Sequence, residues 1–222
     1  MSETFLFILS LSISFAVIIG IVRYRKIDPS YYPFIYYITL MLLIEIVVKI
    51  LTDTRTFQVI GPMMNIYTLA EFSLLAWLFH AWGLFNRNKL FFTILMSAFF
   101  VAWLLITVIM NSILYDSNYY FRVLYSFALV LFAVSAFNKM VVNHRGSIFQ
   151  NAQFWICLGI IIFFTFFLLD NATKLSLVRH TISQDFRINL QKIIVFSNLL
   201  VNILYVVAVI WIPRKKNFMT NF

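Results

Sequence analysis

The chain has 222 residues, of which 63% are hydrophobic and only 11% are charged. Soluble globular domains carry about 25% charged residues, so this composition excludes that class and is typical of a membrane protein with several spans. The formal net charge is +9, but no basic patch interleaved with aromatic residues indicates a nucleic-acid partner. Anionic lipid headgroups of the bilayer are the expected counterpart of the basic residues.

Seven apolar runs follow one another along the chain, each long enough to cross about 30 Å of hydrocarbon. They are expected at about 5–22, 32–51, 64–85, 90–110, 119–137, 152–174 and 193–212, with short connections between them. We therefore predict an all-α fold in which residues 1–222 form one domain, a polytopic seven-transmembrane helix bundle. Cys157 is the single cysteine, which excludes a disulfide framework within the chain.

Charges at the ends of the runs predict the orientation in the membrane. The first run follows Glu3 and precedes Arg23, Arg25 and Lys26, the reverse of a secretory signal, so we expect an uncleaved helix that enters with its N-terminus outside. Alternate connections and the C-terminus are also basic, at Arg87, Lys89, Lys139, Arg145 and Arg214-Lys215-Lys216. A cytoplasmic C-terminus in a bacterial inner membrane is therefore predicted. The last connection is an exception, because it carries Lys174, Arg179, Arg187 and Lys192 but would lie outside. The side of the membrane on which this connection lies is therefore left open.

Ionisable residues inside the apolar runs are the main functional signal. A charge in a spanning helix costs about 2.5–3.5 kcal/mol on insertion scales and is seldom left facing lipid. Glu45 and Lys49 lie four residues apart within 32–51, a spacing that puts both on one face and predicts mutual neutralisation. Glu71 has the same spacing from Tyr67 within 64–85 but no basic partner nearby.

Further polar residues lie in the later runs. Asp170 and Lys174 are near the end of 152–174, Asn198 and Asn202 share one face of 193–212, and Arg122, expected as a solvated helix end, begins 119–137. In the predicted orientation Glu45, Glu71, Asp170, Asn198 and Asn202 meet in the outer half of the bundle. Lys49, Lys174 and Arg122 form the rim, and tyrosines such as Tyr67 and Tyr125 form walls.

This convergence predicts an outward-opening pocket for a small polar ligand. The structural alternative is that the same groups only fix helix register or hydrogen-bond between helices. An enzyme is not expected, since His80, His144 and His180 fall at separate places and no Gly-x-Ser-x-Gly motif occurs. No metal and no cofactor are expected.

Two short sequence similarities relate the first three apolar runs to the last three. Ser14-Phe15-Ala16-Val17 resembles Ser126-Phe127-Ala128-Leu129, and Glu45-x-x-x-Lys49 resembles Asp170-x-x-x-Lys174, as a parallel 3+1+3 repeat would give. In helix number and orientation the chain resembles the heptahelical arrangement of microbial rhodopsins, sugar-transporting SWEET proteins and PnuC vitamin transporters. Lys192 lies at the entrance of the last run, not mid-span, and no Pro-Gln pair occurs, so the resemblance implies architecture and no activity.

Glycine usage bears on the choice between functions. Of five glycines only Gly159 lies well inside a run, whereas secondary transporters commonly use helices broken by glycine or proline. Continuous helices favour a receptor or sensor that binds a ligand and signals through a separate partner. A proton-coupled transporter that uses Glu71 as the proton carrier, and a membrane assembly subunit, remain the alternatives.

Overall fold

The computed structural model describes residues 7, 9–85, 89–109, 118–143 and 146–215. This part of the chain is helical and contains no β-strand, which confirms the predicted all-α class. The helices are α2 (Ile13–Arg23), α3 (Tyr32–Asp53), α4 (Ile60–Ala81), α5 (Lys89–Ile109), α7 (Tyr119–Asn143), α8 (Ala152–Lys174), α9 (Ser176–Arg179) and α10 (Gln184–Trp211).

Six helices within the described ranges, α3, α4, α5, α7, α8 and α10, are long and apolar enough to cross a membrane. This finding is compatible with a membrane protein. The seventh predicted span is not confirmed, because α2 has 11 residues and the start of the 5–22 run lies outside the described residues. Met110, Arg87, Arg145 and Lys216 also lie outside them.

Local chemistry explains where two helices depart from the predicted bounds. α4 ends at Ala81 and not at 85, because Gly83 adopts φ 72°, a left-handed conformation that closes helices. The Gly83 N–H donates to the carbonyl of His80 (2.9 Å) and the Leu84 N–H to that of Phe79 (3.0 Å). At its other end, α4 includes Pro62 in its first turn, where proline's missing N–H costs nothing.

α10 begins at Gln184, well before the predicted 193, so Arg187 and Lys192 lie in the helix and not in a connection. The hydroxyl of Ser183 accepts a hydrogen bond from the Phe186 N–H (3.3 Å), and Asp185 lies in the first turn. Both features favour a helix start, because they satisfy free N–H groups and complement the helix dipole. α7 likewise continues to Asn143, beyond the predicted 137.

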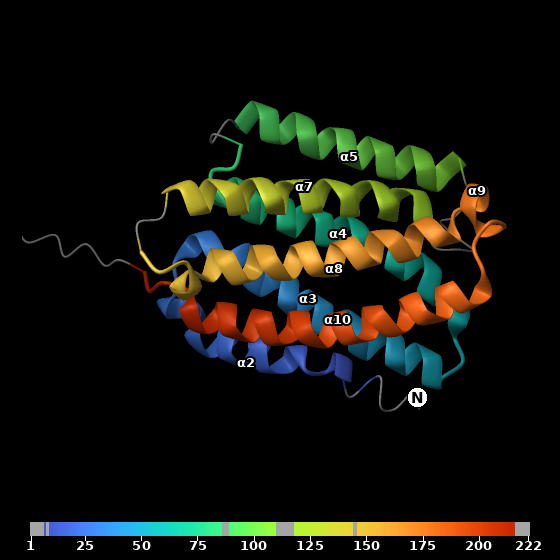
Figure 1. Cartoon of the computed structure of the whole chain (residues 1–222), viewed down its shortest axis with the longest axis horizontal. Coiled ribbons are helices and arrows are strands. Elements are labelled where there is room, and N and C mark those ends of the chain that lie inside the picture. Colours follow the sequence, from blue (N-terminus) through green and yellow to red (C-terminus); the bar gives the residue numbers. More distant parts are fainter. Residues whose placement is uncertain (1–6, 8, 86–88, 110–117, 144–145, 216–222) are drawn as a thin grey trace, which may run out of the picture.

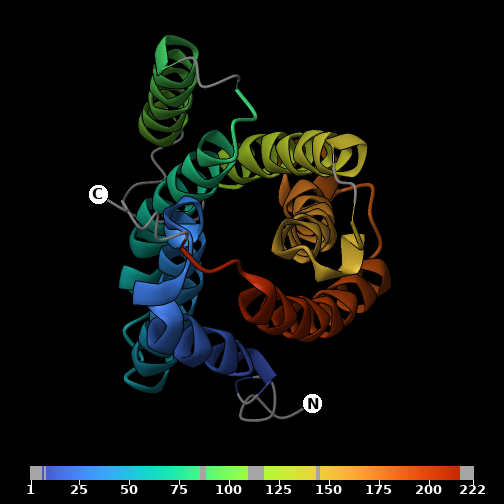
Figure 2. The same ribbon diagram turned by 90° about the vertical axis from the view of Figure 1, so that its left-hand side faces the viewer.

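Six of the helices are packed as a closed ring. α2 packs against α3, α3 against α4, α4 against α7, α7 against α8, α8 against α10, and α10 back against α2. The long axes run along the molecule in Figure 1, and Figure 2 shows α5 standing apart from the others. The ring encloses the core, and α5 packs on its outside against α4 and α7.

A buried polar cluster holds α5 to the ring. The indole N–H of Trp103 donates to the carbonyl of Asn65 in α4 (3.0 Å). The amide of Asn118, just before α7, donates to the Thr107 hydroxyl (3.0 Å), and the Asn118 backbone N–H donates to Asn65 Oδ1 (2.9 Å). These bonds satisfy polar groups that hydrocarbon could not solvate.

Arg23, at the end of α2, joins α2 to the C-terminus of α10 at one end of the bundle. Its guanidinium donates to the carbonyls of Ile210 (2.7 Å) and Ile212 (3.1 Å), and also to that of Val209, at the C-terminus of α10. A cation at this position satisfies free carbonyls and complements the helix dipole. The chain beyond α10 then pairs with the α2–α3 connection, where the Lys215 N–H donates to the Lys26 carbonyl (2.8 Å).

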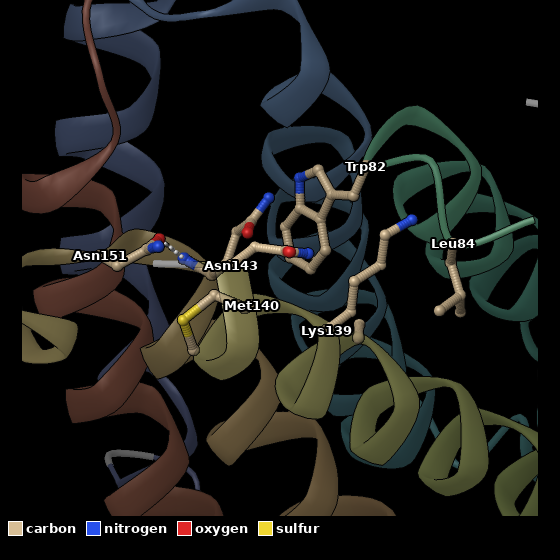
Figure 3. Close-up of a pocket in the computed structure, with 8 residues that line it drawn as sticks. Trp82, Leu84, Lys139, Met140, Asn143 and Asn151 are labelled. Atoms are coloured by element: carbon tan, nitrogen blue, oxygen red, sulfur yellow. Dashed lines mark hydrogen bonds between the residues drawn. The ribbon is translucent and has the colours of Figure 1, made fainter. Parts of the chain in front are cut away.

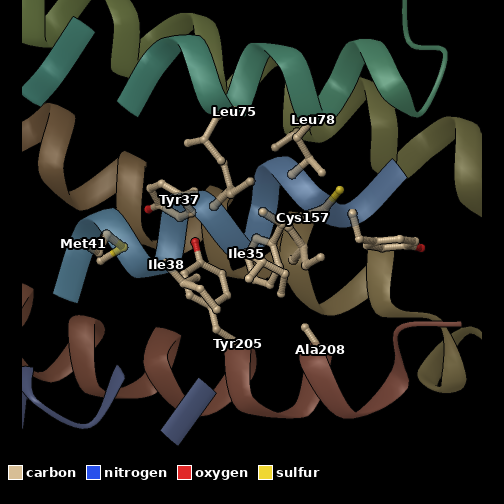
Figure 4. Packing of buried hydrophobic residues seen from close by; sticks show 14 of the residues in the cluster. Ile35, Tyr37, Ile38, Met41, Leu75, Leu78, Cys157, Tyr205 and Ala208 are labelled. Atoms are coloured by element: carbon tan, nitrogen blue, oxygen red, sulfur yellow. The ribbon is translucent and has the colours of Figure 1, made fainter. Parts of the chain in front are cut away.

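Aromatic rings fill the middle of the ring, as Figure 4 shows for Tyr37 and Tyr205. Both residues are fully buried, and their ring centroids lie 6.1 Å apart in an edge-to-face arrangement. Phe34 packs edge-on against Tyr205 at 5.2 Å. Gly159 of α8 makes room for this packing, since a Cβ there would lie 2.5 Å from Tyr205 Cε1.

We predict that Gly159→Ala destabilises the protein by about 1–3 kcal/mol, because the buried Tyr205 ring has to move. Without the contact with Tyr205, Gly→Ala should instead stabilise the helix by about 1 kcal/mol, because alanine is the better helix former. The sign of the change in stability therefore tests the prediction. Gly20→Ala is the control, because the nearest atom to its Cβ would be the end of the Ile35 side chain at 3.0 Å, which can rotate away. Chemical unfolding of both variants in detergent micelles measures the difference, and equal stabilities would contradict the prediction.

Candidate functional site

A cavity of about 240 Å³ lies inside the ring, in the half of the bundle nearer α9. Four residues of the predicted site line it: Glu45 of α3, Tyr67 and Glu71 of α4, and Asn198 of α10. The convergence of these three helices on one space was expected from sequence. The remaining lining is mainly apolar and comes from the same helices and α8, including Met41, Met64, Phe163, Phe167 and Ile194.

Glu71 is the most deeply buried acid of the site, with 2% of its surface exposed. The Tyr67 hydroxyl donates to Oε1 (2.8 Å), which confirms the face shared by these two residues. The Tyr125 hydroxyl of α7 donates to Oε2 (2.6 Å). Each oxygen of the Glu71 carboxyl group therefore has a hydrogen-bond donor, the arrangement that a buried acid needs.

Arg122 was expected to be a solvated helix end on the rim, and that expectation is wrong. Its side chain is buried, with 7% exposed, and it is absent from the residues lining the cavity. It interacts electrostatically with Glu71 and with Tyr125, and its guanidinium lies 6.0 Å from the Tyr119 ring. Arg122 is thus a buried positive charge near Glu71 but outside the cavity lining, and its Nε and Nη2 atoms have no hydrogen-bond partner among the described residues.

Lys49 does not neutralise Glu45 as the spacing predicted. Its ammonium pairs with Asp53 (2.6 Å), one turn further along α3 and more exposed to the surroundings. A lysine near a helix end extends its charge toward the polar end of the span, and Asp53 offers the same four-residue spacing there. Ser10 lies beside Glu45, but its hydroxyl donates to the Phe7 carbonyl (2.9 Å).

The structure places three other predicted site residues away from the cavity. Asp170 pairs with Lys174 (2.5 Å), and this ammonium also lies 5.7 Å from the Tyr119 ring. The Asn202 amide donates to the Ser12 hydroxyl (2.8 Å), so it ties α10 to the chain before α2. None of the three is among the residues that line the cavity.

Asn198 differs from Asn202 in lining the cavity. Its Oδ1 atom is buried, and the described residues offer it no hydrogen-bond partner. Buried amide oxygens are seldom left in that state. The cavity thus presents acceptor groups from Glu45, Glu71 and Asn198. Within the described ranges no cluster of three histidine, cysteine or acidic side chains has the geometry to hold a metal ion.

Sequence reasoning missed the apolar part of the site. Met41, Met64 and the stacked pair Phe163 and Phe167, whose ring centroids are 5.6 Å apart, line the cavity without any spacing or charge that would single them out. In the sequence of an apolar helix, no pattern distinguishes the aromatic residues that line a cavity from those that face elsewhere. Only the rotation and register of the packed helices determine which apolar side chains line it.

A second cavity of about 200 Å³ lies at the opposite end of the bundle, among Trp82, Lys139, Asn143, Asn151 and Gln153. Figure 3 shows these side chains. Two of the polar groups already serve helix ends, since Lys139 donates to the Gly83 carbonyl (2.6 Å) and Asn151 Oδ1 accepts from the Gln153 N–H (2.9 Å). These groups stabilise the ends of α4 and α8, and we favour the central cavity as the functional site.

Tyr125→Phe should lower the free energy of unfolding by about 1–3 kcal/mol, because it leaves one oxygen of the buried Glu71 without its donor. Tyr120→Phe is the matched control on the same helix, since its hydroxyl bonds only the Ser176 hydroxyl at an exposed position (2.8 Å). Thermal unfolding of the two purified variants provides the comparison. Equal losses would show that the Glu71 bond carries no special weight.

Comparison with known proteins gives no independent assignment. No protein-family model, no curated protein and no solved structure matches this chain. The function therefore has to be inferred from the cavity, from the groups that line it and from the helices that carry them.

Proposed function

We propose that this chain is an integral membrane protein of the receptor or sensor type, which binds a small ligand in the central cavity. The cavity that gathers Glu45, Tyr67, Glu71 and Asn198 is the observation that carries the proposal. Polar groups that only fix helix register are expected to hydrogen-bond directly to one another across the helix interface. Here a space of about 240 Å³ lies between two acids and an amide, which three different helices supply. A binding site for a small molecule requires such a space.

The basic residues support a location and an orientation. Arg23, Arg25 and Lys26 lie at the end opposite α9, where Arg214 and Lys215 also meet the α2–α3 connection. The positive-inside rule favours the cytoplasm for that end. The N-terminus would then be outside, the cavity would lie in the outer half of the bundle, and the ligand would arrive from outside a bacterial inner membrane.

The helix arrangement supports a route for transmission. α2–α3–α4 and α7–α8–α10 are packed in the same order, and the contacts α4–α7 and α10–α2 join them. If the triplet of helices α2–α3–α4 and the triplet α7–α8–α10 are exchanged, the set of contacts stays the same. A 3+1+3 repeat would produce this symmetry. Because α3 and α4 form one side of the cavity and α8 and α10 the other, a ligand would shift one triplet against the other. A separate membrane partner would respond to this movement.

Continuous helices favour binding over alternating access. α3, α4, α8 and α10 run unbroken past the cavity, without the unwound segments that line many transporter sites. Proton-coupled transport is the second candidate, and Glu71 favours it. This buried carboxylate faces the cavity and has two tyrosine hydroxyls as neighbours, and acids inside membrane bundles commonly belong to proton relays. An assembly subunit is the third candidate.

A binding assay paired with a flux assay separates these functions. The purified protein would be screened for thermal stabilisation by a panel of small amines, alcohols and carboxylates. A ligand at 100 times its Kd adds about 2.7 kcal/mol to stability. Proteoliposomes with an internal pH dye would then report proton movement when the stabilising compound is added, for the wild type and for Glu71→Gln.

We expect stabilisation by at least one compound without proton movement. Solute-dependent proton movement that is lost in Glu71→Gln would instead establish transport. If no compound stabilises the protein and it copurifies in a stable complex with another membrane protein, the assembly function replaces the receptor. Asp170→Asn is the matched control, because it removes a carboxylate that lies outside the cavity.

A further inference from the structure

We infer that the ligand of the central cavity is a small organic cation, an ammonium group carried on a compact apolar body. This inference rests on the proposed binding function and names the class of molecule that the cavity would take. It follows from three properties of the lining: its charge, its unused hydrogen-bonding groups and its apolar wall.

The ionisable acids of the lining have no matching base beside them among the described residues of the cavity. Glu45 and Glu71 are both present, and the described lining residues include no lysine, arginine or histidine. The two nearby lysines are engaged elsewhere, Lys49 with Asp53 and Lys174 with Asp170. Glu71 has Arg122 as an electrostatic partner behind it, but no cation in the described ranges pairs with Glu45. A cationic ligand would supply the counter-charge that a carboxylate inside a bundle requires.

Hydrogen bonding points to the same class of ligand. The two hydroxyls beside Glu71 already donate to its oxygens, and the hydroxyl of Thr68 donates to the Asn65 carbonyl (2.8 Å). What remains is the Glu45 carboxylate and the buried Asn198 Oδ1, which are both acceptors. An ammonium group has donors for both, whereas a carboxylate or phosphate ligand would place a second negative group beside the acidic side chains of the lining.

The rest of the lining selects an organic body and a limited size. Met41, Ile44, Met64 and Ile194 are apolar, and the Phe163 and Phe167 rings are stacked with an interplanar angle of 14°. Aromatic faces stabilise organic cations. A bare metal ion would need several convergent oxygen ligands, and pockets for drug-sized molecules have volumes of about 300–1,000 Å³. The volume of about 240 Å³ suits a smaller amine.

Three six-carbon probes test the charge preference at constant size: hexylammonium, hexanol and hexanoate. Their Kd values for the purified full chain in lipid nanodiscs would be measured by calorimetry, for the wild type, Glu45→Gln, Asn198→Leu and Asp170→Asn. We expect hexylammonium to bind at least tenfold more tightly than the other two. Glu45→Gln should weaken hexylammonium about tenfold or more, and Asp170→Asn should bind it as the wild type does.

Each outcome has a separate meaning. Hexanol or hexanoate binding as tightly as hexylammonium, or an unchanged Kd in both Glu45→Gln and Asn198→Leu, overturns the cation assignment while binding itself stands. Failure of all three probes, together with failure of the wider panel above, removes the binding function as well. If Glu45→Gln does not fold, Asn198→Leu supplies the same comparison, because it removes the second free acceptor of the cavity.

Discussion

A carboxylate inside a bundle of apolar helices has to be satisfied by the protein itself, and Glu71 is where this constraint acts most strongly. With 2% of its surface exposed, it receives one hydroxyl from Tyr67 on its own helix and one from Tyr125 on α7. The second bond links α4 to α7, the helices where the two triplets of the ring meet. Arg122 adds a buried positive charge that interacts electrostatically with Glu71 and with Tyr125. The packing of this part of the ring therefore depends on one acid.

The two sides of the cavity differ in their hydrogen bonding: the side at Glu71 is satisfied within the protein, and the side at Glu45 and Asn198 is not. Around Glu71 each carboxylate oxygen has a tyrosine hydroxyl donor, so the hydrogen bonding of this wall is satisfied within the protein. Asn198 Oδ1 has no hydrogen-bond partner among the described residues, and Glu45, which lies beside Ser10, has no basic partner because Lys49 pairs with Asp53. Ligand sites commonly combine such a preorganised wall with a few groups that need an external partner. The diversion of Lys49 to Asp53 is what leaves the Glu45 side in that state.

Local patterns in the sequence were informative wherever both partners lay on one helix or beside one turn. The spacing of Tyr67 and Glu71 predicted their contact, and the apolar runs predicted the long helices. The spacing of Glu45 and Lys49 misled, because Asp53 repeats it toward the polar end of the helix and an i,i+4 pattern cannot choose between two acids. Helix ends were misplaced where a single residue decides them, as Gly83 and Ser183 do.

Composition and periodicity were therefore sufficient, by themselves, for the all-helical class, the apolar character of the long helices and the acids that need a polar interior. These properties depend on the hydrophobic effect and on contacts within one helical turn, which a linear sequence records. The tertiary structure alone decided that Tyr125 completes Glu71, that Arg122 is buried, that Asn198 and not Asn202 faces the cavity, and that α8 supplies its aromatic wall. Those outcomes depend on the rotation and register of helices far apart in the chain, where many apolar faces are nearly equivalent until they pack.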